Sequence, residues 1–155
     1  MIKKVFEYLI SNNETISFAE SCSGGNLSSS ISKIPGASKI FVGSIVSYSK
    51  YSKEKVLGIK RNELNAFSTV SQETTIKMAE KVKEKFNSDY SIAITGNAGP
   101  TSDSSESNVG DCFIAISYKN EIFCEKYHLA MTREDFIKTV TNKSFKLFYD
   151  KIINQ

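Results

Sequence analysis

Apolar residues in the first fifty positions follow two different spacings. At the start of the chain they recur every three or four positions, which predicts an amphipathic helix: Ile2, Val5, Phe6, Leu9 and Ile10. Later apolar runs are short, bounded by turn-forming residues and rich in branched or aromatic side chains, which is typical of strands. We expect strands at 16–19 and 40–49, a turn at 21–25, and a helix at 26–33 that stops before Pro35-Gly36.

The second half of the chain predicts two long helices and three strands. Ser71 is a suitable N-cap for one helix, and Thr132, with Asp135 three residues later, resembles a capping box for the helix that closes the chain. The remaining elements are short helical pieces within 50–66, strands at 90–95, 112–118 and 122–128, and a mobile, serine-rich surface loop at 97–110. The last two strands are close enough in sequence to form a hairpin.

These elements predict one α/β domain over residues 1–155, a three-layer α/β/α sandwich around a mostly parallel, mixed sheet. A length of 155 residues, with 40 % hydrophobic and 24 % charged residues, suits one globular core. No apolar run is long enough to span a bilayer, and the N-terminus lacks the hydrophobic stretch of a signal peptide. Three cysteines cannot all pair with one another, so we expect reduced thiols in a cytoplasmic protein: Cys22, Cys112 and Cys124.

Charge and histidine content exclude several classes of function. The chain has 20 basic and 17 acidic side chains, and its most lysine-rich stretch, 77–85, interleaves Glu80 and Glu84. This pattern indicates a solvated helix face, not a nucleic-acid surface. The single histidine, His128, cannot form a two-histidine zinc motif, and any Ser-His-Asp triad would have to use it. We interpret His128 as a strand histidine with satisfied hydrogen bonds.

Polar side chains stand at the C-terminal ends of three of the predicted strands: Ser21, Tyr48 and Thr95. If these strands are parallel, the three side chains converge on one edge of the sheet, where ligands of open α/β sheets bind. The turn after Ser21 contains Gly24-Gly25, which allows close backbone approach by a ligand, and its free N–H groups could hold an anion or a developing oxyanion. The alternative is that the two glycines only begin a helix.

A serine nucleophile in this chain needs a base other than histidine, and a lysine is an accepted alternative. Lysine acts as a base only when its pKa falls from about 10.4 towards neutrality, which burial can bring about. Lys50, Lys53 and Lys55 all lie near the predicted edge, and these considerations alone do not choose among them.

Arg133 follows the predicted N-cap Thr132, so a positive charge lies at the positive end of a helix dipole. Two interpretations are open. The side chain extends into solvent without a partner, or its guanidinium and the helix N–H groups share an anion such as the phosphate of a mononucleotide.

Five segments along the chain have the form of motifs: AESCSGG at 19–25, FVGSIVSYS at 41–49 with Lys53, LGI at 57–59 with Val70-Ser71, TGNAGP at 95–100, and Val109-Gly110. In order and at compatible spacing, they resemble AESCTGG, FxxGxVxYSNxxK, LGV…VS, TGIAGP and VG. Those are motifs of the CinA C-terminal domain family, the nicotinamide-nucleotide amidohydrolases. The resemblance covers nearly the whole chain.

The resemblance implies hydrolysis of nicotinamide mononucleotide to nicotinic acid mononucleotide and ammonia, with no metal and no cofactor. It makes Ser21 the nucleophile and Lys53 the general base, places Tyr48 in the proton-transfer network, and gives Thr95 an orienting role. It also implies self-association and substrate contacts from seven further residues besides Arg133: Ser23, Gly24, Gly25, Gly43, Gly96, Ala98 and Gly99. Larger family members carry an additional N-terminal domain, and this chain starts directly at the amidase-like part.

The chain departs from the family pattern at several positions near the expected site. Ser23 replaces a threonine, Lys50 replaces an asparagine, 101–108 replaces a glycine-rich loop, and Asp111-Cys112 replaces Thr-Val. These departures motivate a second hypothesis, a ligand-binding protein of the competence- or damage-inducible kind with weak or no turnover.

Overall fold

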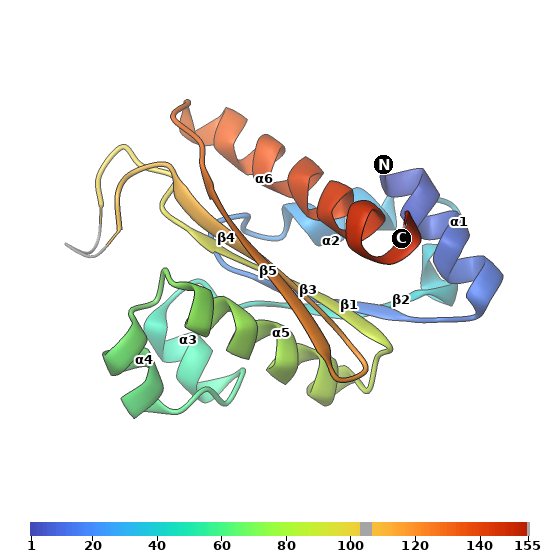
Figure 1. Cartoon of the computed structure of the whole chain (residues 1–155), viewed down its shortest axis with the longest axis horizontal. Helices are drawn as coiled ribbons and strands as arrows, with labels where there is room; N and C mark the ends of the chain where they lie inside the picture. The colour runs from blue at the N-terminus through green and yellow to red at the C-terminus, as the bar shows by residue number, and fades with distance from the viewer. Residues whose placement is uncertain (103–106, 155) are drawn as a thin grey trace.

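The computed structural model describes residues 1–102 and 107–154, which form a five-stranded sheet with helices on both faces (Figure 1). The strand order is β2-β1-β3-β4-β5. The strands are β1 (Ile16–Glu20), β2 (Phe41–Val46), β3 (Tyr90–Gly96), β4 (Asp111–Tyr118) and β5 (Glu121–His128). Each predicted strand is present, and no bound differs from its prediction by more than three residues.

The sheet is mixed, as predicted. β1 pairs in parallel with β2 and with β3, whereas β4 is antiparallel to both β3 and β5. Within the described part of the chain, β4 therefore runs against the other four strands. The carboxyl ends of β1, β2 and β3 meet at one edge, as the convergence of their polar side chains requires.

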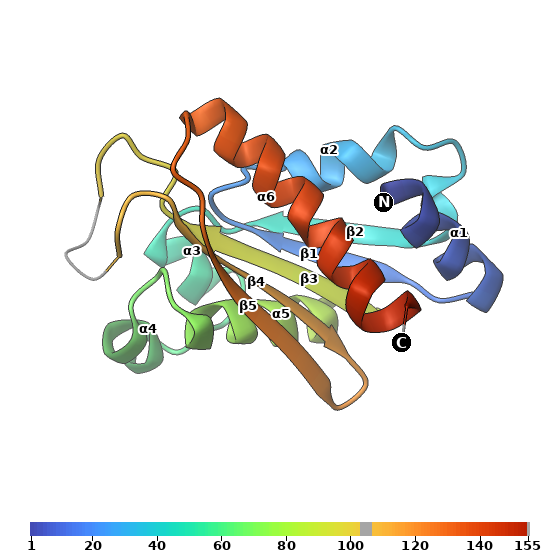
Figure 2. The same cartoon turned by 45° about the horizontal axis from the view of Figure 1, so that its top comes forward.

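The helices form two layers, and the sheet lies between them (Figure 2). On one face lie α1 (Ile2–Asn12), α2 (Asn26–Ser32) and α6 (Arg133–Phe148), and on the other lie α3 (Lys50–Lys55), α4 (Arg61–Phe67) and α5 (Gln72–Phe86). A 3₁₀ helix, η1 (Ala37–Lys39), and a π-helix, η2 (Tyr149–Ile153), complete the described helical structure. The three-layer α/β/α sandwich is thus confirmed.

The two faces of the sheet pack differently because their side chains differ in size. Under α5 the neighbouring strands present a row of alanines in register, Ala19, Ala93 and Ala115. Small side chains allow the helix to lie close to the sheet. The opposite face presents larger side chains to α1, α2 and α6, among them Phe18 and Ile92, which are fully buried.

The strand expected at 40–49 ends earlier, at Val46, because its partner β1 ends at Glu20. Just beyond the paired residues, the Ser47 N–H bonds to the Glu20 carbonyl at 2.8 Å. The chain then leaves the sheet and enters α3, where the Ser49 hydroxyl accepts the Ser52 N–H as a cap. This exit carries Tyr48 out of the sheet.

The loop expected at 97–110 is a connection between antiparallel strands. Residues 103–106 of the loop lie outside the described residues.

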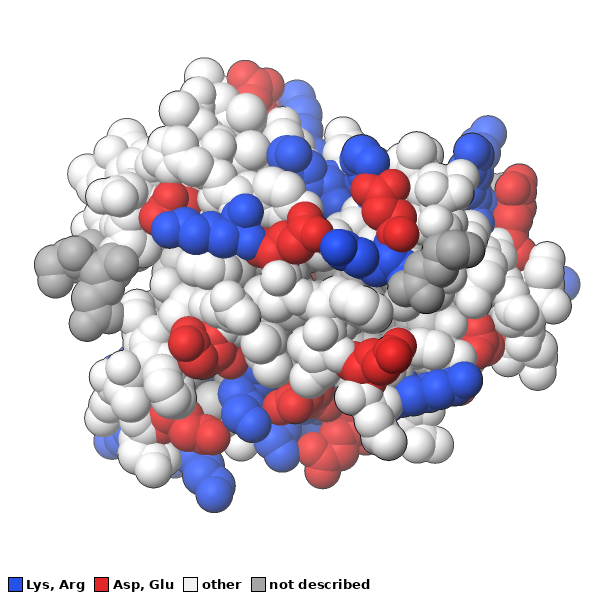
Figure 3. Space-filling model, viewed as in Figure 1, with Lys and Arg blue, Asp and Glu red and all other residues white. Residues whose placement is uncertain are grey.

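No helix in the described part of the chain is both long and apolar enough to cross a membrane. On the face shown in Figure 3, basic and acidic side chains are interleaved.

Candidate active site

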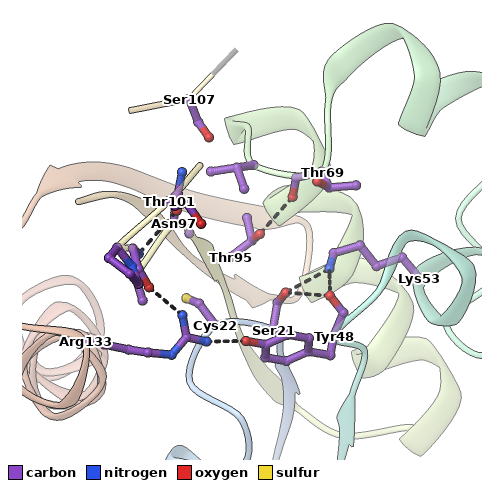
Figure 4. Close-up of a pocket in the computed structure, with 15 residues that line it drawn as sticks. Ser21, Cys22, Tyr48, Lys53, Thr69, Thr95, Asn97, Thr101, Ser107 and Arg133 are labelled. Carbon is purple, nitrogen blue, oxygen red and sulfur yellow. Dashed lines mark hydrogen bonds between the residues drawn. The ribbon is translucent and has the colours of Figure 1, made fainter. Parts of the chain in front are cut away.

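A cavity of about 260 Å³ lies at the carboxyl ends of β1, β2 and β3 (Figure 4). Its walls come from the ends of these strands, the loop after β3, α3, the segment before α5, and the start of α6. The lining residues are Ser21, Cys22, Tyr48, Lys53, Thr69, Val70, Thr95, Gly96, Asn97, Ala98, Gly99, Pro100, Thr101, Ser107 and Arg133. All four predicted catalytic residues are therefore brought together.

Ser21 lies on a sharp turn between β1 and α2. Its N–H still bonds to the Ile94 carbonyl of β3 at 3.0 Å, and its carbonyl accepts the Gly24 N–H at 3.0 Å. The turn needs a positive φ at Gly24 (59°) and Gly25 (99°), a conformation that glycine adopts without strain. This geometry holds a nearly buried serine hydroxyl at the edge of the cavity.

The N–H groups at the start of α2 are not free, contrary to the expectation from sequence. The carboxylate of Glu20 accepts the N–H groups of Gly25 (3.0 Å), Leu27 (3.0 Å) and Ser28 (2.9 Å). It also accepts the Ser23 hydroxyl at 2.8 Å. A side chain of the protein itself therefore occupies the place expected for a ligand, and Ser23, Gly24 and Gly25 do not line the cavity.

Lys53 projects from α3 to Ser21 and is only 1 % exposed. Its Nζ lies 2.9 Å from Ser21 Oγ, 2.7 Å from the Ser47 carbonyl oxygen and 3.5 Å from the Tyr48 carbonyl oxygen. Burial lowers the pKa of Lys53 from 10.5 to about 8, although the nearby Cys22 acts in the opposite direction. Of the three neighbouring lysines, the structure thus places Lys53 against the serine.

Lys50, the departure from the family pattern in this segment, points elsewhere. Its Nζ donates to the Asn65 side-chain oxygen of α4 at 2.5 Å, and Lys50 does not line the cavity. The extra positive charge is directed into an exposed contact between two helices.

The proton-transfer role predicted for Tyr48 would require its hydroxyl to contact Ser21 or Lys53. The hydroxyl contacts neither residue. It accepts a hydrogen bond from Arg133 Nη2, and only the main-chain carbonyl of Tyr48 faces the serine and lysine (Figure 4). Arg133 Nη1 also donates to the Gly99 carbonyl at 2.7 Å. Arg133 therefore reaches into the cavity, and the alternative of an unpartnered side chain in solvent is wrong.

Thr95 is 1 % exposed, and its hydroxyl donates to the Thr69 carbonyl at 2.8 Å. It thereby links the end of β3 to the segment before α5. Gly96, Ala98 and Gly99 line the cavity beside it, as expected. Gly43 lies away from it, under α5, where a Cβ atom would come within 2.6 Å of the Phe86 ring.

Several lining residues escaped sequence reasoning. Thr69 precedes the predicted helix cap and lies in no motif. Val70 belongs to a motif but was given no role, and Asn97 stands where the family motif has isoleucine, so no chemical signal marked them. Cys22 neighbours the predicted nucleophile, and burial raises the pKa of its thiol. A thiol that resists ionisation is a poor nucleophile, which leaves Ser21 as the better candidate.

His128 lies outside the cavity lining and has a partner. Its Nδ1 is 2.8 Å from Oδ1 of Asp111, a residue of the neighbouring strand that is nearly buried. Lys126 pairs with the other oxygen of Asp111 at 3.2 Å. The interpretation of a satisfied strand histidine is confirmed.

In residues 1–102 and 107–154, no three His, Cys, Asp or Glu side chains are grouped as a metal site would require.

The sequence model of one protein family, the CinA C-terminal domain, matches residues 1–152 of the chain. The chain belongs to the CinA C-terminal domain family. It is 42 % identical over 139 residues to a CinA-like protein of Flavobacterium psychrophilum, and 41 % identical over 149 residues to one of Fervidobacterium nodosum. These matches cover 90 % and 96 % of the chain but 33 % and 36 % of the two relatives, so the chain spans about a third of their length.

Solved structures of CinA proteins share the fold. The chain superposes with a TM-score of 0.93 on the CinA superfamily protein of Enterobacter cloacae, at 26 % identity, covering 97 % of this chain and 89 % of that one. The competence damage-inducible protein A of Klebsiella pneumoniae gives a TM-score of 0.95 at 22 % identity, covering 98 % and 94 %. The second match shows the fold alone.

Proposed function

We propose that this CinA domain is an amidohydrolase that cleaves the carboxamide of nicotinamide mononucleotide through a Ser21–Lys53 pair. The observation that carries the proposal is the contact of 2.9 Å between Ser21 Oγ and the Nζ of a buried lysine whose pKa is lowered to about 8. A base with a pKa near the working pH combines a useful neutral fraction with good proton affinity.

The surroundings of Lys53 suit a base directed at Ser21. In the neutral amine, two hydrogens can be donated to the carbonyls of Ser47 and Tyr48, which leaves the lone pair facing Ser21 Oγ. Ser21 Oγ would attack the carboxamide carbon while Lys53 takes its proton. When the C–N bond breaks, that proton leaves with the amide nitrogen as ammonia. Water then attacks the ester, Lys53 accepts a proton from the water and passes it to the departing Ser21 Oγ, and the carboxylic acid and free serine are released.

The developing oxyanion would be held by the main-chain N–H of Cys22, which lines the cavity. This N–H makes no hydrogen bond to any other described residue, unlike the N–H groups taken by Glu20. Donors that point at developing charge in a site that excludes water contribute strongly to catalysis.

The phosphate of the mononucleotide would bind Arg133. Among the lining residues Arg133 and Lys53 are the two cations, and Lys53 is committed to the serine. Arg133 is exposed and now donates to two neutral oxygens, which an anion would replace with a stronger, charge-assisted contact.

The decisive experiment measures ammonia release from nicotinamide mononucleotide by the purified protein and by Ser21→Ala. We expect the variant to lose at least about 1,000-fold in kcat because the nucleophile is gone. Cys22→Ala is the matched variant, since it removes the neighbouring thiol and keeps the hydroxyl. An acyl adduct trapped in Cys22→Ala, and absent from Ser21→Ala, would place the ester on Ser21.

The second candidate, a ligand-binding protein without turnover, predicts a different result from the same assay. It is motivated by the substituted loop after Pro100, of which Thr101 and Ser107 line the cavity. If the mononucleotide binds in a calorimeter and no ammonia appears, the amidohydrolase proposal is wrong and the binding function is favoured.

A further inference from the structure

Glu20, the last residue of β1, carries a carboxylate that is fully buried. None of the ion pairs within residues 1–102 and 107–154 includes it. A carboxylate removed from water without a cation must be stabilised by hydrogen bonds, because its desolvation is otherwise very costly.

Six donors provide this stabilisation. Oε2 accepts Ser23 Oγ at 2.8 Å, the Gly25 N–H at 3.0 Å and the Leu27 N–H at 3.0 Å, and Oε1 accepts the Ser28 N–H at 2.9 Å, Ser28 Oγ at 2.5 Å and Ser44 Oγ at 3.4 Å. Five of the six belong to the turn and first residues of the helix that follow Glu20 directly. The carboxylate thus ties residues 23–28 back to the end of β1.

Ser21 lies inside the segment that this network closes. The Glu20 carboxylate bonds to the Leu27 N–H of α2, whereas the Ser21 hydroxyl faces Lys53 of α3 (Figure 4). The helices α2 and α3 lie on opposite faces of the sheet (Figure 2). The network therefore fixes the turn without blocking the serine. A hydroxyl 2.9 Å from its base tolerates little displacement, because a shift of about 1 Å can lower a rate about 100-fold.

We propose that Glu20 is a positioning residue: its carboxylate acts as an internal anion that holds the serine turn and keeps Ser21 within hydrogen-bond distance of Lys53. The inference rests on the proposed Ser21–Lys53 chemistry but not on the identity of the substrate. It can therefore be tested with a probe that reports on the serine alone.

The test measures the rate at which a fluorophosphonate modifies Ser21, with loss of fluoride, in the unaltered protein and in Glu20→Gln. The amide has the size of the carboxylate but one of its two oxygens becomes an NH₂ group, which cannot accept an N–H from the turn. We expect folded Glu20→Gln to be labelled about 10- to 100-fold more slowly. In ammonia release, kcat should fall similarly while KM changes little. The midpoint of the pH profile should not move, because the pKa of Lys53 is lowered by its own burial and not by Glu20.

Glu14→Gln is the matched control. Glu14 is also a partly buried acceptor, of the Tyr90 hydroxyl at 3.0 Å and the Tyr118 hydroxyl at 3.3 Å, but it lies at the other end of the sheet. Its loss should lower stability and leave the labelling rate of folded protein unchanged. Wild-type labelling of Glu20→Gln, or equal slowing in both variants, would overturn the proposal.

Ser28→Ala covers the case in which Glu20→Gln does not fold. It keeps the carboxylate and removes one hydroxyl donor, so we expect labelling to slow about 5-fold. A wild-type rate in this variant would also overturn the proposal. If the wild-type protein is labelled but releases no ammonia from the mononucleotide, the proposed substrate is wrong and the labelling comparison between the variants remains valid. If the wild-type protein is not labelled, both the Ser21–Lys53 chemistry and the positioning role of Glu20 are wrong.

Discussion

Lys53 is held among uncharged groups at the edge of the sheet. Its Nζ contacts one hydroxyl and two main-chain carbonyls, and it forms no ion pair among the residues that the structure describes. Carbonyl dipoles only partly replace the water that a charged amine loses on burial. The pKa of Lys53 therefore falls to about 8, and the residue becomes a candidate base.

Lys53→Arg should abolish ammonia release while nucleotide binding is retained. Arginine keeps the positive charge but stays protonated near neutral pH, so it cannot accept the Ser21 proton. We expect kcat to fall at least about 1,000-fold, with the Kd measured by calorimetry changed less than about threefold.

His128→Gln serves as the companion variant, since His128 bonds to Asp111 outside the cavity lining. It should turn over at close to the wild-type rate. Substantial activity in Lys53→Arg, or a large loss in His128→Gln, would mean that the base has been assigned to the wrong residue.

The pH dependence of kcat/KM provides an independent check. The base must be neutral, so activity should rise with pH and level off above the pKa of Lys53, with a midpoint near pH 8. A profile that is flat between pH 6.5 and 9 would contradict a lysine base.

At the scale of elements, the start of α6 forms one wall of the cavity and connects two others. Arg133, its first residue, bonds to the Tyr48 side chain after β2 and to the Gly99 carbonyl after β3. Thr132 caps the helix through a bond from the Asp135 N–H. The cap and the packing of α6 on the sheet thus place the guanidinium across the cavity.

Arg133→Ala should weaken binding of nicotinamide mononucleotide about 10- to 100-fold, because a charge-assisted contact to phosphate is lost. Binding of the corresponding nucleoside, which has no phosphate, should change less than about twofold. Both values can be measured by calorimetry.

Lys138→Ala is the control for the loss of a positive charge from the same helix. Lys138 is exposed and pairs with Glu134 at 2.7 Å, away from the cavity lining. It should bind both ligands as the wild type does. If Arg133→Ala weakened both ligands equally, the phosphate contact would be excluded.

At the scale of the whole molecule, burial of Lys53 has a cost in stability. The unfolded chain binds a proton at Lys53 up to about pH 10.5, whereas the folded chain releases it near pH 8. Between these values the unfolded state holds more protons, so the free energy of unfolding rises with pH. Below pH 8 the full cost applies.

Lys53→Met isolates this effect, because titration of all other groups is common to both proteins. We expect the free energy of unfolding of the wild type, relative to the variant, to increase by about 2–3 kcal/mol between pH 7 and pH 10. Urea denaturation at several pH values measures the difference. A difference that stays constant or falls with pH would show that Lys53 is not buried as a cation at neutral pH.

The sequence by itself determined the elements and the residues that converge on the site. Hydrophobic periodicity and capping residues are local signals, so the N-caps of the two long helices, Ser71 and Thr132, were predicted correctly and the five strands to within three residues of their observed bounds. Parallel pairing of the first three strands then brings Ser21 and Thr95 to one edge, whatever their distance along the chain.

Only the tertiary structure decided which groups touch. Selection of Lys53 over Lys50 depends on the direction in which α3 leaves the sheet, and the Arg133–Tyr48 contact joins residues 85 positions apart. The burial of Lys53, and with it the lowered pKa, depends on packing from several elements at once. Glu20 is the clearest case: sequence predicted free N–H groups in the turn after Ser21, but folding brings a carboxylate onto them, because a buried charge takes the nearest unpaired donors.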